Sequence, residues 1–368
     1  MNDPYGLARV FCMMLTVWLL GCAEGGTGGT GGIAPPDNTS PPTVSMSGHV
    51  HKGPYEGGST VNVTQVDGGL DRGSTEVDTD LGDYQITVES DGPLQIDVSG
   101  RHFSETVGAY TNAEVLLSAI VDPVSGDTQV NVNLLTHLIH SRVLELMSAS
   151  IDVGQAVDMA QSELLLAFSN VLPPPDGATV FSRLLIINSL QLVDDEVGNA
   201  YLFALSSIFE RHATNLAARN NTSQAFELDG LIDQLADDLS DDGALDLSAE
   251  VETDLQQAMG ELNPAVIYLN LLQIDQVLEL AIQASDQAES EAFVFSDTVT
   301  VVGDSFEFSV NVDSDDPLTA TTSVTEIVAD IDLFIDTDGD GVVNRDDDDD
   351  DGDGIDDIND DTQYGDGP

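Results

Sequence analysis

The hydrophobic positions of the first folded segment follow a two-residue alternation. Between Thr43 and about Asp122, short stretches rich in β-branched residues are separated by Gly, Pro, Asp and Ser. The stretches are VSMSGHV, STVNVTQV, DYQITVES, PLQIDVSG and EVLLSAIV. Several short strands at this spacing predict a small β-sandwich over residues 43–125.

A helical period replaces the alternation from about Asn131 to Gln287. One apolar stripe is formed by Leu134, Leu135, Leu138, Ile139, Val143, Leu146 and Met147. Asp152 and Ser248 are expected N-caps, Gly243 an expected C-terminal cap, and the prolines at 173–175 separate the second helix from the next segment. Five or six helices, including 196–218 and 264–287, predict a helical bundle over residues 130–290.

Strand patterns return over residues 293–335, and a run dominated by Asp follows at 336–361. The expected strands are FVFSDTVTVV, SFEFSVNV and TSVTEIVADIDLFI. The fold class predicted for the chain is therefore α+β and multidomain. It comprises a small N-terminal β-sandwich, a central helical bundle domain, a short β region and an Asp-rich loop tail.

Residues 1–21 have the features of a signal peptide. One cation, Arg9, precedes an apolar run over residues 10–20 that is too short to span a bilayer comfortably. The run ends in Leu19-Leu20-Gly21-Cys22, which resembles the lipobox of bacterial lipoproteins. That resemblance implies cleavage before Cys22, lipidation of its thiol and anchoring to a membrane, with Ala23 implying the outer membrane. An ordinary secretory signal that contains a Cys is the alternative.

The exported chain would carry no cysteine chemistry. Cys12 lies in the segment to be removed and Cys22 would be lipidated, so neither a disulfide nor a free thiol remains. Residues 22–42 are rich in Gly and Thr and then in Pro, which predicts a tether between the lipid and the folded part.

The charge balance excludes one class of partner. The chain has 67 acidic against 9 basic residues, a formal net charge of -58 in 368 residues. Nucleic-acid binding needs a basic footprint, so we expect no nucleic-acid partner. With 41% hydrophobic residues, the chain can still bury real cores.

The N-terminal β segment resembles the carboxypeptidase regulatory-like or transthyretin-like domain over about 80 residues. The resemblance is carried by Gly48-His49-Val50, Gly53-Pro54, Gly57-Gly58 and the hairpin motif Thr79-Asp80-Leu81-Gly82-Asp83-Tyr84. It implies a non-catalytic module in a secreted protein. The join VNVNLLTHL, a strand running directly into a helix, resembles an arrangement in surface lipoproteins of myxobacteria, which implies location and modularity.

The tail has the spacing of two calcium loops. It holds 14 Asp in 26 residues, with Arg345 as the one cation. Positions 1, 3, 5, 7, 9 and 12 of the first loop are Asp336, Asp338, Asp340, Val342, Asn344 and Asp347. Those of the second, thirteen residues later, are Asp349, Asp351, Asp353, Ile355, Asp357 and Asp360. Calcium takes six to eight oxygen ligands, Gly at position 6 permits the turn, and the apolar residue at 7 offers its carbonyl while its side chain packs. A solvated acidic tail is the alternative.

Asp at position 12 and the lack of flanking helices distinguish these loops from EF-hands. The tail resembles thrombospondin type 3 repeats instead, with Asp where cysteines usually separate the loops. That resemblance implies that calcium ions form the core of the tail. The register stays open at one position, since Asp346 or Asp348 could replace Asp347.

Other candidate chemistry is weaker. Gly303-Asp304-Ser305 resembles the nucleophile block of GDS-type esterases, but no Asp-x-x-His follows, and a hairpin turn is expected there. His137 and His140 lie three apart on a helix and could share a metal face, but no HExxH-like companion exists and ordinary solvated histidines are expected. His49 and His51 alternate on one strand face, where a half-buried arrangement is expected rather than a metal site. No Walker loop, dinucleotide fingerprint or GxSxG elbow occurs.

Three functions remain from these observations. We favour a calcium-binding lipoprotein of the outer membrane or cell surface with a structural, adhesive or scaffolding role and no catalysis. The second is a module that binds a polysaccharide or an extracellular protein partner. The third is an unrecognised extracellular hydrolase.

Overall fold

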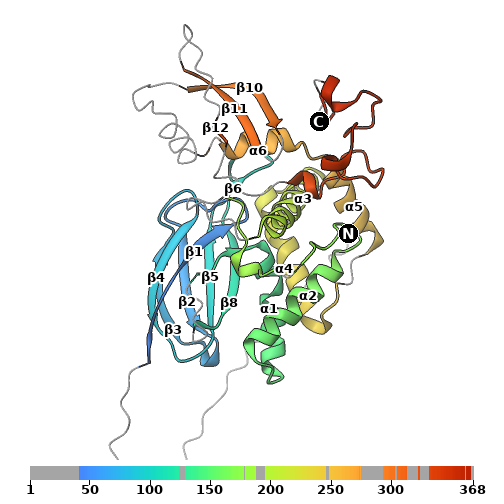
Figure 1. Ribbon diagram of the computed structural model, residues 1–368. Helices are drawn as coiled ribbons and strands as arrows, with labels where there is room; N and C mark the ends of the chain where they lie inside the picture. The colour runs from blue at the N-terminus through green and yellow to red at the C-terminus, as the bar shows by residue number, and fades with distance from the viewer. Residues whose placement is uncertain are drawn as a thin grey trace, which may run out of the picture. The chain divides into compact units, whose positions relative to one another are not determined.

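The computed structural model describes the chain from residue 41 onward (Figure 1). The described residues are 41–123, 129–177, 179–187, 195–245, 248–272, 274, 293–302, 305–312, 322–323, 331–360 and 362–365. The predicted signal peptide, Cys22 and nearly all of the tether lie outside them. Residues 41–368 form one compact unit.

Two sheets make up the N-terminal region. The first has the strand order β4-β1-β9, and the second has the order β3-β2-β5-β8. Their strands are β1 (Thr43–His51), β2 (Thr60–Gln65), β3 (Asp71–Glu76), β4 (Asp83–Glu89), β5 (Leu94–Gly100), β8 (Val115–Val121) and β9 (Val132–Asn133), and a small ribbon joins β6 (Phe103–Ser104) to β7 (Ala109–Tyr110). All pairings in the two sheets are antiparallel except β1 with β9, which run parallel.

Alternate burial explains why these segments are strands. In β5 the apolar residues Leu94, Ile96 and Val98 are fully buried, and the polar residues between them are half-buried. β4 shows the same period. The five predicted strands are confirmed. β3 was missed because DRGSTE contains no apolar residue, as an edge strand permits.

Six helices follow the sheets in the described chain. They are α1 (Leu134–Ser148), α2 (Val153–Ala167), α3 (Glu196–Asn220), α4 (Gln224–Asp242), α5 (Ala249–Gly260) and α6 (Pro264–Leu272). The side chains of Asp152 and Ser248 accept N-cap hydrogen bonds, and Gly243 ends α4 in the left-handed region, all as predicted. The expected helix 264–287 is described only to Leu272. α2 ends at Ala167, earlier than the prolines at 173–175.

α3 is the central element of the helical region. Every residue from Gly198 to Glu210 is buried. The helix packs against α1, α4, α5 and the 3-10 turn η4 (Ile331–Leu333). A helix enclosed on all sides needs apolar or small residues around its whole circumference, and the segment AYLFALSSIF provides them.

The sheets and helices share one hydrophobic core. It includes residues from Met46 in β1 to Ile335 at the start of the tail. At the join, Asn133 ends β9 and caps α1, since Asn133 Oδ1 accepts from the Thr136 amide (3.0 Å) while Thr136 Oγ1 accepts from the Asn133 amide (2.9 Å). The prediction of a mixed α and β chain, with N-terminal sheets followed by a helical region, is confirmed.

The last β region differs from the prediction at its C-terminal end, and residues 324–330 of the expected third strand lie outside the described residues. β10 (Phe293–Val302) and β11 (Ser305–Val312) are antiparallel, and Val302 pairs with Ser305, as expected for strands joined at residues 303–304. The expected third strand over 322–335 begins with β12 (Thr322–Ser323), but it is wrong at its end, because Ile331–Leu333 is a 3-10 turn. Ile331, Phe334 and Ile335 lie three and four residues apart and are all buried, a spacing that suits a helical turn rather than a strand.

Candidate metal centre

Two triplets of carboxylates in the tail could each hold a metal ion. In one triplet, formed by Asp336, Asp338 and Asp340, each residue offers an oxygen within 4.8 Å of the others. Asp349, Asp351 and Asp353 form the second triplet under the same limit. They are the only such groups of three or more His, Cys, Asp or Glu in the described chain. These six residues are positions 1, 3 and 5 of the two predicted loops.

The two triplets are built by one pattern of hydrogen bonds repeated every thirteen residues. Asp336 Oδ2 accepts from the Gly341 amide at 3.0 Å, and Asp349 Oδ2 accepts from the Gly354 amide at 2.9 Å. At position 5, Asp340 Oδ1 accepts from the amide of the residue two further on at 2.8 Å, and Asp353 Oδ1 does the same at 2.8 Å. The loops therefore turn alike around their carboxylates.

The turn itself depends on glycine at position 6. Gly341 has φ +96° and Gly354 has φ +91°, in the left-handed region that other residues adopt at a cost. This backbone lets the chain reverse so that positions 1, 3 and 5 face a common point. The sequence prediction rested on the same two glycines.

The second halves of the two loops also have equivalent structures. The 3-10 turns η5 (Asn344–Asp346) and η6 (Asp357–Asn359) occupy the same loop positions. Asp347 and Asp360 are equivalent, because Oδ1 of each accepts from the amide two residues later, at 3.1 and 2.8 Å. The repeat thus pairs Asp347 with Asp360 at position 12.

Position 9 is arranged differently from the triplets. Asn344 is buried, and its Oδ1 accepts from the Thr337 amide (3.0 Å) and from Thr337 Oγ1 (3.1 Å). Asp357 Oδ1 accepts from the Asp350 amide at 2.9 Å in the same way. The four predicted ligands at positions 9 and 12, Asn344, Asp347, Asp357 and Asp360, are not members of the triplets.

The apolar residues at position 7 lie at the surface. Val342 is 39% exposed and Ile355 is 46% exposed. The expectation that their side chains pack is therefore wrong in both loops, because the turn around the carboxylates directs position 7 to solvent. Their carbonyls remain predicted ligands.

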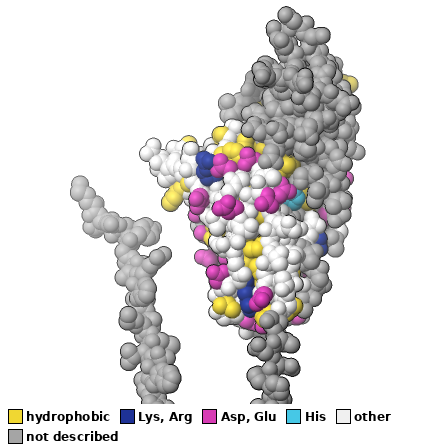
Figure 2. Space-filling model, turned by 90° about the vertical axis from the view of Figure 1, so that its left-hand side faces the viewer, with side chains coloured by type: hydrophobic (Ala, Val, Ile, Leu, Met, Phe, Trp, Pro, Cys, Tyr) yellow, Lys and Arg dark blue, Asp and Glu magenta, His cyan; other side chains and the backbone are white. Residues whose placement is uncertain are grey.

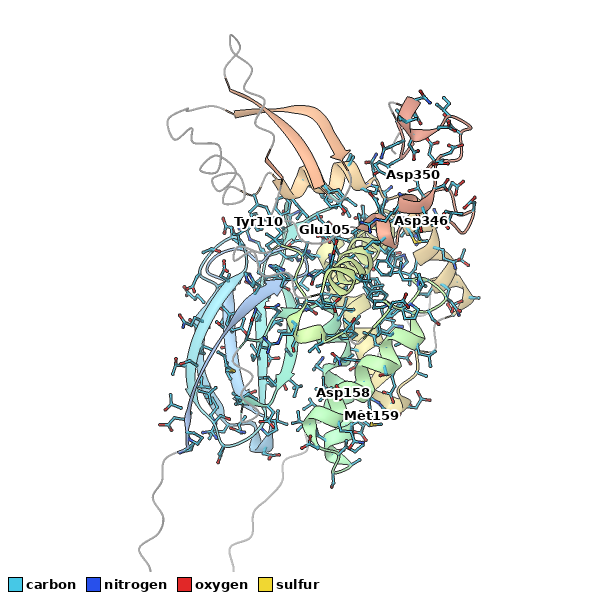
Figure 3. All side chains as sticks on the ribbon, in the orientation of Figure 1. Glu105, Tyr110, Asp158, Met159, Asp346 and Asp350 are labelled. Atoms are coloured by element: carbon cyan, nitrogen blue, oxygen red, sulfur yellow. The ribbon has the colours of Figure 1, made fainter. Side chains whose placement is uncertain are left out.

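Asp350 is a buried carboxyl that the sequence prediction did not single out. It occupies the place that Thr337 has in the first loop, so a neutral Thr–Asn pair is replaced by Asp350 beside Asp357. Its side chain is 4% exposed, and burial, followed by the charge of Asp357, raises its pKa to about 8. Figure 3 labels Asp350 and Asp346 in the tail.

Buried oxygens in the second loop would suit a bound cation. Among the described residues, Asp349 Oδ1, Asp350 Oδ1 and Asp360 Oδ2 are buried and accept no hydrogen bond. A buried carboxylate oxygen without a partner is costly. A cation held by Asp349 would remove that cost at one of these atoms. The donor set, carboxylates only, is the one preferred by hard cations such as Ca²⁺ and Mg²⁺.

The start of the tail is fixed to the helical region. The Phe334 ring packs edge-on against Tyr201 of α3 with centroids 5.5 Å apart. The Ile331 amide donates to the Tyr268 hydroxyl of α6 at 2.7 Å. At the other end, the Tyr364 hydroxyl donates to Asp332 Oδ2 at 3.2 Å. The loops therefore lie between two anchored points.

The histidine candidates have structural roles. The ring of His51 is fully buried, with Nδ1 accepting from the Ile186 amide (3.0 Å) and Nε2 donating to the Leu81 carbonyl (3.0 Å). Both nitrogens are thus used, and burial lowers the His51 pKa to about 3. His137 and His140 stack with centroids 4.9 Å apart, and His137 Nε2 lies 3.4 Å from Asp233. Neither pair belongs to a metal-sized cluster in the part of the chain that the structure describes.

An open cleft lies among the helices. It has a volume of about 620 Å³ and is lined from α3, α4 and α5 by residues that include His212, Leu216, Phe226, Leu231 and Val251. Phe226 is 66% exposed. The cleft combines apolar walls with the ion pair of Arg219 and Asp254 at 2.8 Å.

The described surface reflects the acidic composition. On the face in Figure 2, acidic side chains are spread among neutral ones and few basic side chains are visible. Across the described residues, no helix combines the length and the apolar character needed to cross a bilayer.

Comparisons of the chain with protein-family models, with curated proteins and with solved structures gave no match. The resemblances to the lipobox, to the carboxypeptidase regulatory-like domain and to thrombospondin type 3 repeats therefore remain predictions from the residues that carry them.

Proposed function

We propose that the chain is an exported lipoprotein of the outer membrane or cell surface whose C-terminal loops bind calcium. In this proposal Cys22 carries the lipid, residues 23–42 form the tether, and the folded part is a β-sandwich joined to a helical domain. The role is structural or adhesive rather than catalytic.

The observation that supports calcium is the repetition of the triplet. In each loop, oxygens of three carboxylates lie within 4.8 Å of one another, and equivalent hydrogen bonds hold both loops. An acidic run without a ligand would not be expected to repeat this arrangement. Three carboxylates held this close repel one another without a counter-ion. The remaining ligands would be the carbonyls of Val342 and Ile355, and side chains at positions 9 and 12 that turn inward, or water. Ca²⁺ accepts such irregular shells more readily than Mg²⁺.

The loops also have a mechanical context. Phe334 and Ile331 fix their beginning on α3 and α6, and Tyr364 returns to Asp332. A cation in each triplet would stiffen the chain between these anchors. Without metal the tail would be held mainly by the anchors, since like charges oppose its compaction.

Calorimetric titration of the non-lipidated chain, residues 23–368, tests the proposal. We expect saturable calcium binding with dissociation constants on the order of 10⁻⁴ to 10⁻³ M, as in extracellular loops. Asp338→Asn combined with Asp351→Asn should remove binding, because each change neutralises the middle carboxylate of one triplet. The matched control is Asp67→Asn with Asp237→Asn, which changes the charge equally at exposed positions outside the tail.

Two outcomes would contradict calcium binding. One is the absence of saturable heat with the unchanged chain. The other is an equal loss of binding in the control, which would indicate a diffuse acidic atmosphere. Stronger binding of Mg²⁺ than of Ca²⁺ would retain the metal site and reject the calcium assignment.

The cleft supports a second function, binding of an extracellular protein or glycan ligand. Its exposed Phe226 beside polar walls is the specific observation. Phe226→Ala should abolish capture of such a ligand without affecting calcium binding. If the unchanged chain and Phe226→Ala bind the same peptides and glycans equally in a screen, this second function is rejected.

A further inference from the structure

The single lysine of this chain is completely buried. Lys52 follows β1, and its side chain is 0% exposed. Two equally buried carboxylates face it, Glu105 directly after β6 and Glu210 in α3. Figure 3 places Glu105 at the boundary between the sheets and the helices. A buried amine beside two buried carboxyl groups can react with one of them as well as form ion pairs.

The distances bring the three groups into reaction range. Lys52 Nζ lies 3.1 Å from Glu105 Oε1 and 3.6 Å from Glu210 Oε1. The same Glu210 oxygen, Oε1, lies 3.0 Å from His102 Nε2, and Oε2 accepts from the amide and hydroxyl of Thr106 at 3.3 and 3.1 Å. Glu210 is therefore firmly oriented beside the amine.

The Glu105 carboxyl is held more loosely and carries a free oxygen. Oε1 accepts from Ser206 Oγ at 2.8 Å, whereas Oε2 is buried and has no hydrogen-bond partner among the described residues. Its main-chain carbonyl accepts from Asn270 Nδ2 at 2.9 Å. The carboxyl carbon of Glu105 is thus fixed next to the amine, with one oxygen bonded and the other unengaged.

Burial makes a neutral Glu105 accessible near neutral pH. Burial, and after it the charge of Glu210, raises the pKa of Glu105 to about 7, while burial lowers the His102 pKa to about 3 and leaves the ring neutral. With Glu105 protonated, the site holds one ammonium and one carboxylate. The ammonium of Lys52 and the carboxylate of Glu210 lie 3.6 Å apart, so a proton can pass directly between them.

We propose that Lys52 and Glu105 are joined by a self-formed isopeptide bond, with Glu210 as the proton relay. The Lys52 ammonium gives a proton to Glu210, and the Nζ lone pair then attacks the carboxyl carbon of Glu105. The C–N bond forms, one Glu105 oxygen leaves as water, and Ser206 Oγ stabilises the charge that develops on Oε1. One proton stays on the amide nitrogen, one remains on Glu210, and the leaving water carries the rest. No oxidant or cofactor is needed.

Gly53 shows how closely the site is fitted. Its φ is +53°, and a Cβ atom there would lie 2.8 Å from Glu105 Oε2 and 1.9 Å from the Phe103 carbonyl oxygen. Only glycine lets the backbone beside Lys52 approach Glu105 this closely. The bond would tie the end of β1 to the β6–β7 ribbon in a chain whose mature form has no disulfide.

The mass of the folded protein tests the proposal directly. The intact chain, residues 23–368, should be lighter than its sequence by one water, and a tryptic digest should contain a branched peptide joining the Lys52 segment to residues 102–142. The unmodified mass in the folded protein would overturn the proposal. So would a water loss that maps to an Asp-Gly pair, where succinimide formation gives the same change.

Two variants test the roles of the carboxylates. Glu105→Gln should release ammonia instead of water, so its cross-linked product should have the same mass as cross-linked wild type. Glu210→Gln should keep its full sequence mass because the proton relay is lost, whereas the exposed Glu145→Gln on α1 should still lose one water. Unlinked Glu105→Gln beside a linked wild type, or a fully linked Glu210→Gln, would contradict the mechanism. If Glu210→Gln does not fold, the mass comparison of Glu105→Gln with wild type decides.

Discussion

Replacing Asp357 by Asn would make the second loop a chemical copy of the first at position 9. In the first loop, Asn344 accepts from the Thr337 amide, and its Nδ2 donates to Thr337 Oγ1 at 2.9 Å. In the second loop, Asp357 accepts from the Asp350 amide but has no hydrogen to offer the Asp350 carboxyl. Asp357→Asn supplies that donor and removes a negative charge.

The size of the effect follows from the pKa of Asp350. An unfolded Asp titrates near 3.9, so with a folded pKa of about 8 the metal-free tail must hold a proton that the unfolded chain releases. At pH 7 this costs up to about 4 kcal/mol. Burial is the first cause and Asp357 the second, so we assign about 1 to 2 kcal/mol to Asp357.

The sign of the pH dependence is fixed by the direction of the shift. A carboxyl with a raised folded pKa leaves stability unaffected below the unfolded pKa and lowers it as the pH rises from about 4 to about 8. The metal-free tail should therefore be more stable at pH 5 than at pH 8. Asp357→Asn should flatten this dependence and have little effect at pH 5.

Hydrogen exchange read by mass spectrometry over residues 331–365, in a chelator, measures the effect locally. At pH 8, Asp357→Asn should slow exchange of the second loop by a factor of about 5 to 30 relative to wild type. The control is Asp346→Asn, an exposed Asp that is not among the causes of the Asp350 shift. Equal exchange of wild type and Asp357→Asn at pH 8, or equal slowing by Asp346→Asn, would refute the reasoning.

Three further predictions concern the scaffold. Phe334→Ala removes a ring that is 6% exposed and packs on α3. The free energy of unfolding, measured in urea, should fall by about 3 to 5 kcal/mol. An unchanged free energy of unfolding would contradict the anchoring of the tail. Gly82→Ala should destabilise clearly more than Gly68→Ala in thermal unfolding, because both have positive φ but only a Cβ at Gly82 meets a carbonyl oxygen, at 2.6 Å, whereas Gly68 has open space. Burial lowers the pKa values of His51 and His102 to about 3. Each should therefore lower the free energy of unfolding by up to about 1.4 kcal/mol per pH unit as the pH falls from 6.5 towards 3. The dependence of stability on pH should be less steep in the neutral variant His51→Gln, and an unchanged slope would contradict the prediction.

The regular elements could be predicted because their periods directly reflect burial. In β5 every second side chain is buried. In α1 the first six residues are all buried, and the spacing of four and three appears only after them, at Val143 and Leu146. The same reasoning failed at Ile331–Leu333, because a short apolar run fits a strand or a helical turn equally well and the packing against α3 decided. β3 carries no apolar signal at all.

The candidate metal centre was predictable in part. Positions 1, 3 and 5 follow from the Asp spacing and the glycine turn, and the structure brings these carboxylates together. Asp350 could have been found by aligning the two thirteen-residue repeats, since it stands where the first repeat has Thr337. The Lys52 cluster had no such signal, because its glutamates lie 53 and 158 residues along the chain from the lysine and only tertiary packing joins them.

The burial of Lys52 also decides how the protein meets reagents and enzymes that act on amines. No other side chain of the sequence carries a primary amine, and this one is enclosed by the core. Amine-directed fixatives, acylating agents and lysine-specific proteases would find no target on the folded surface, so only the arginines offer sites to trypsin-like enzymes. Aldehydes and reactive esters would therefore meet no side-chain amine on the folded surface, and the abundant carboxyl groups are the side chains to use for coupling the protein to a support.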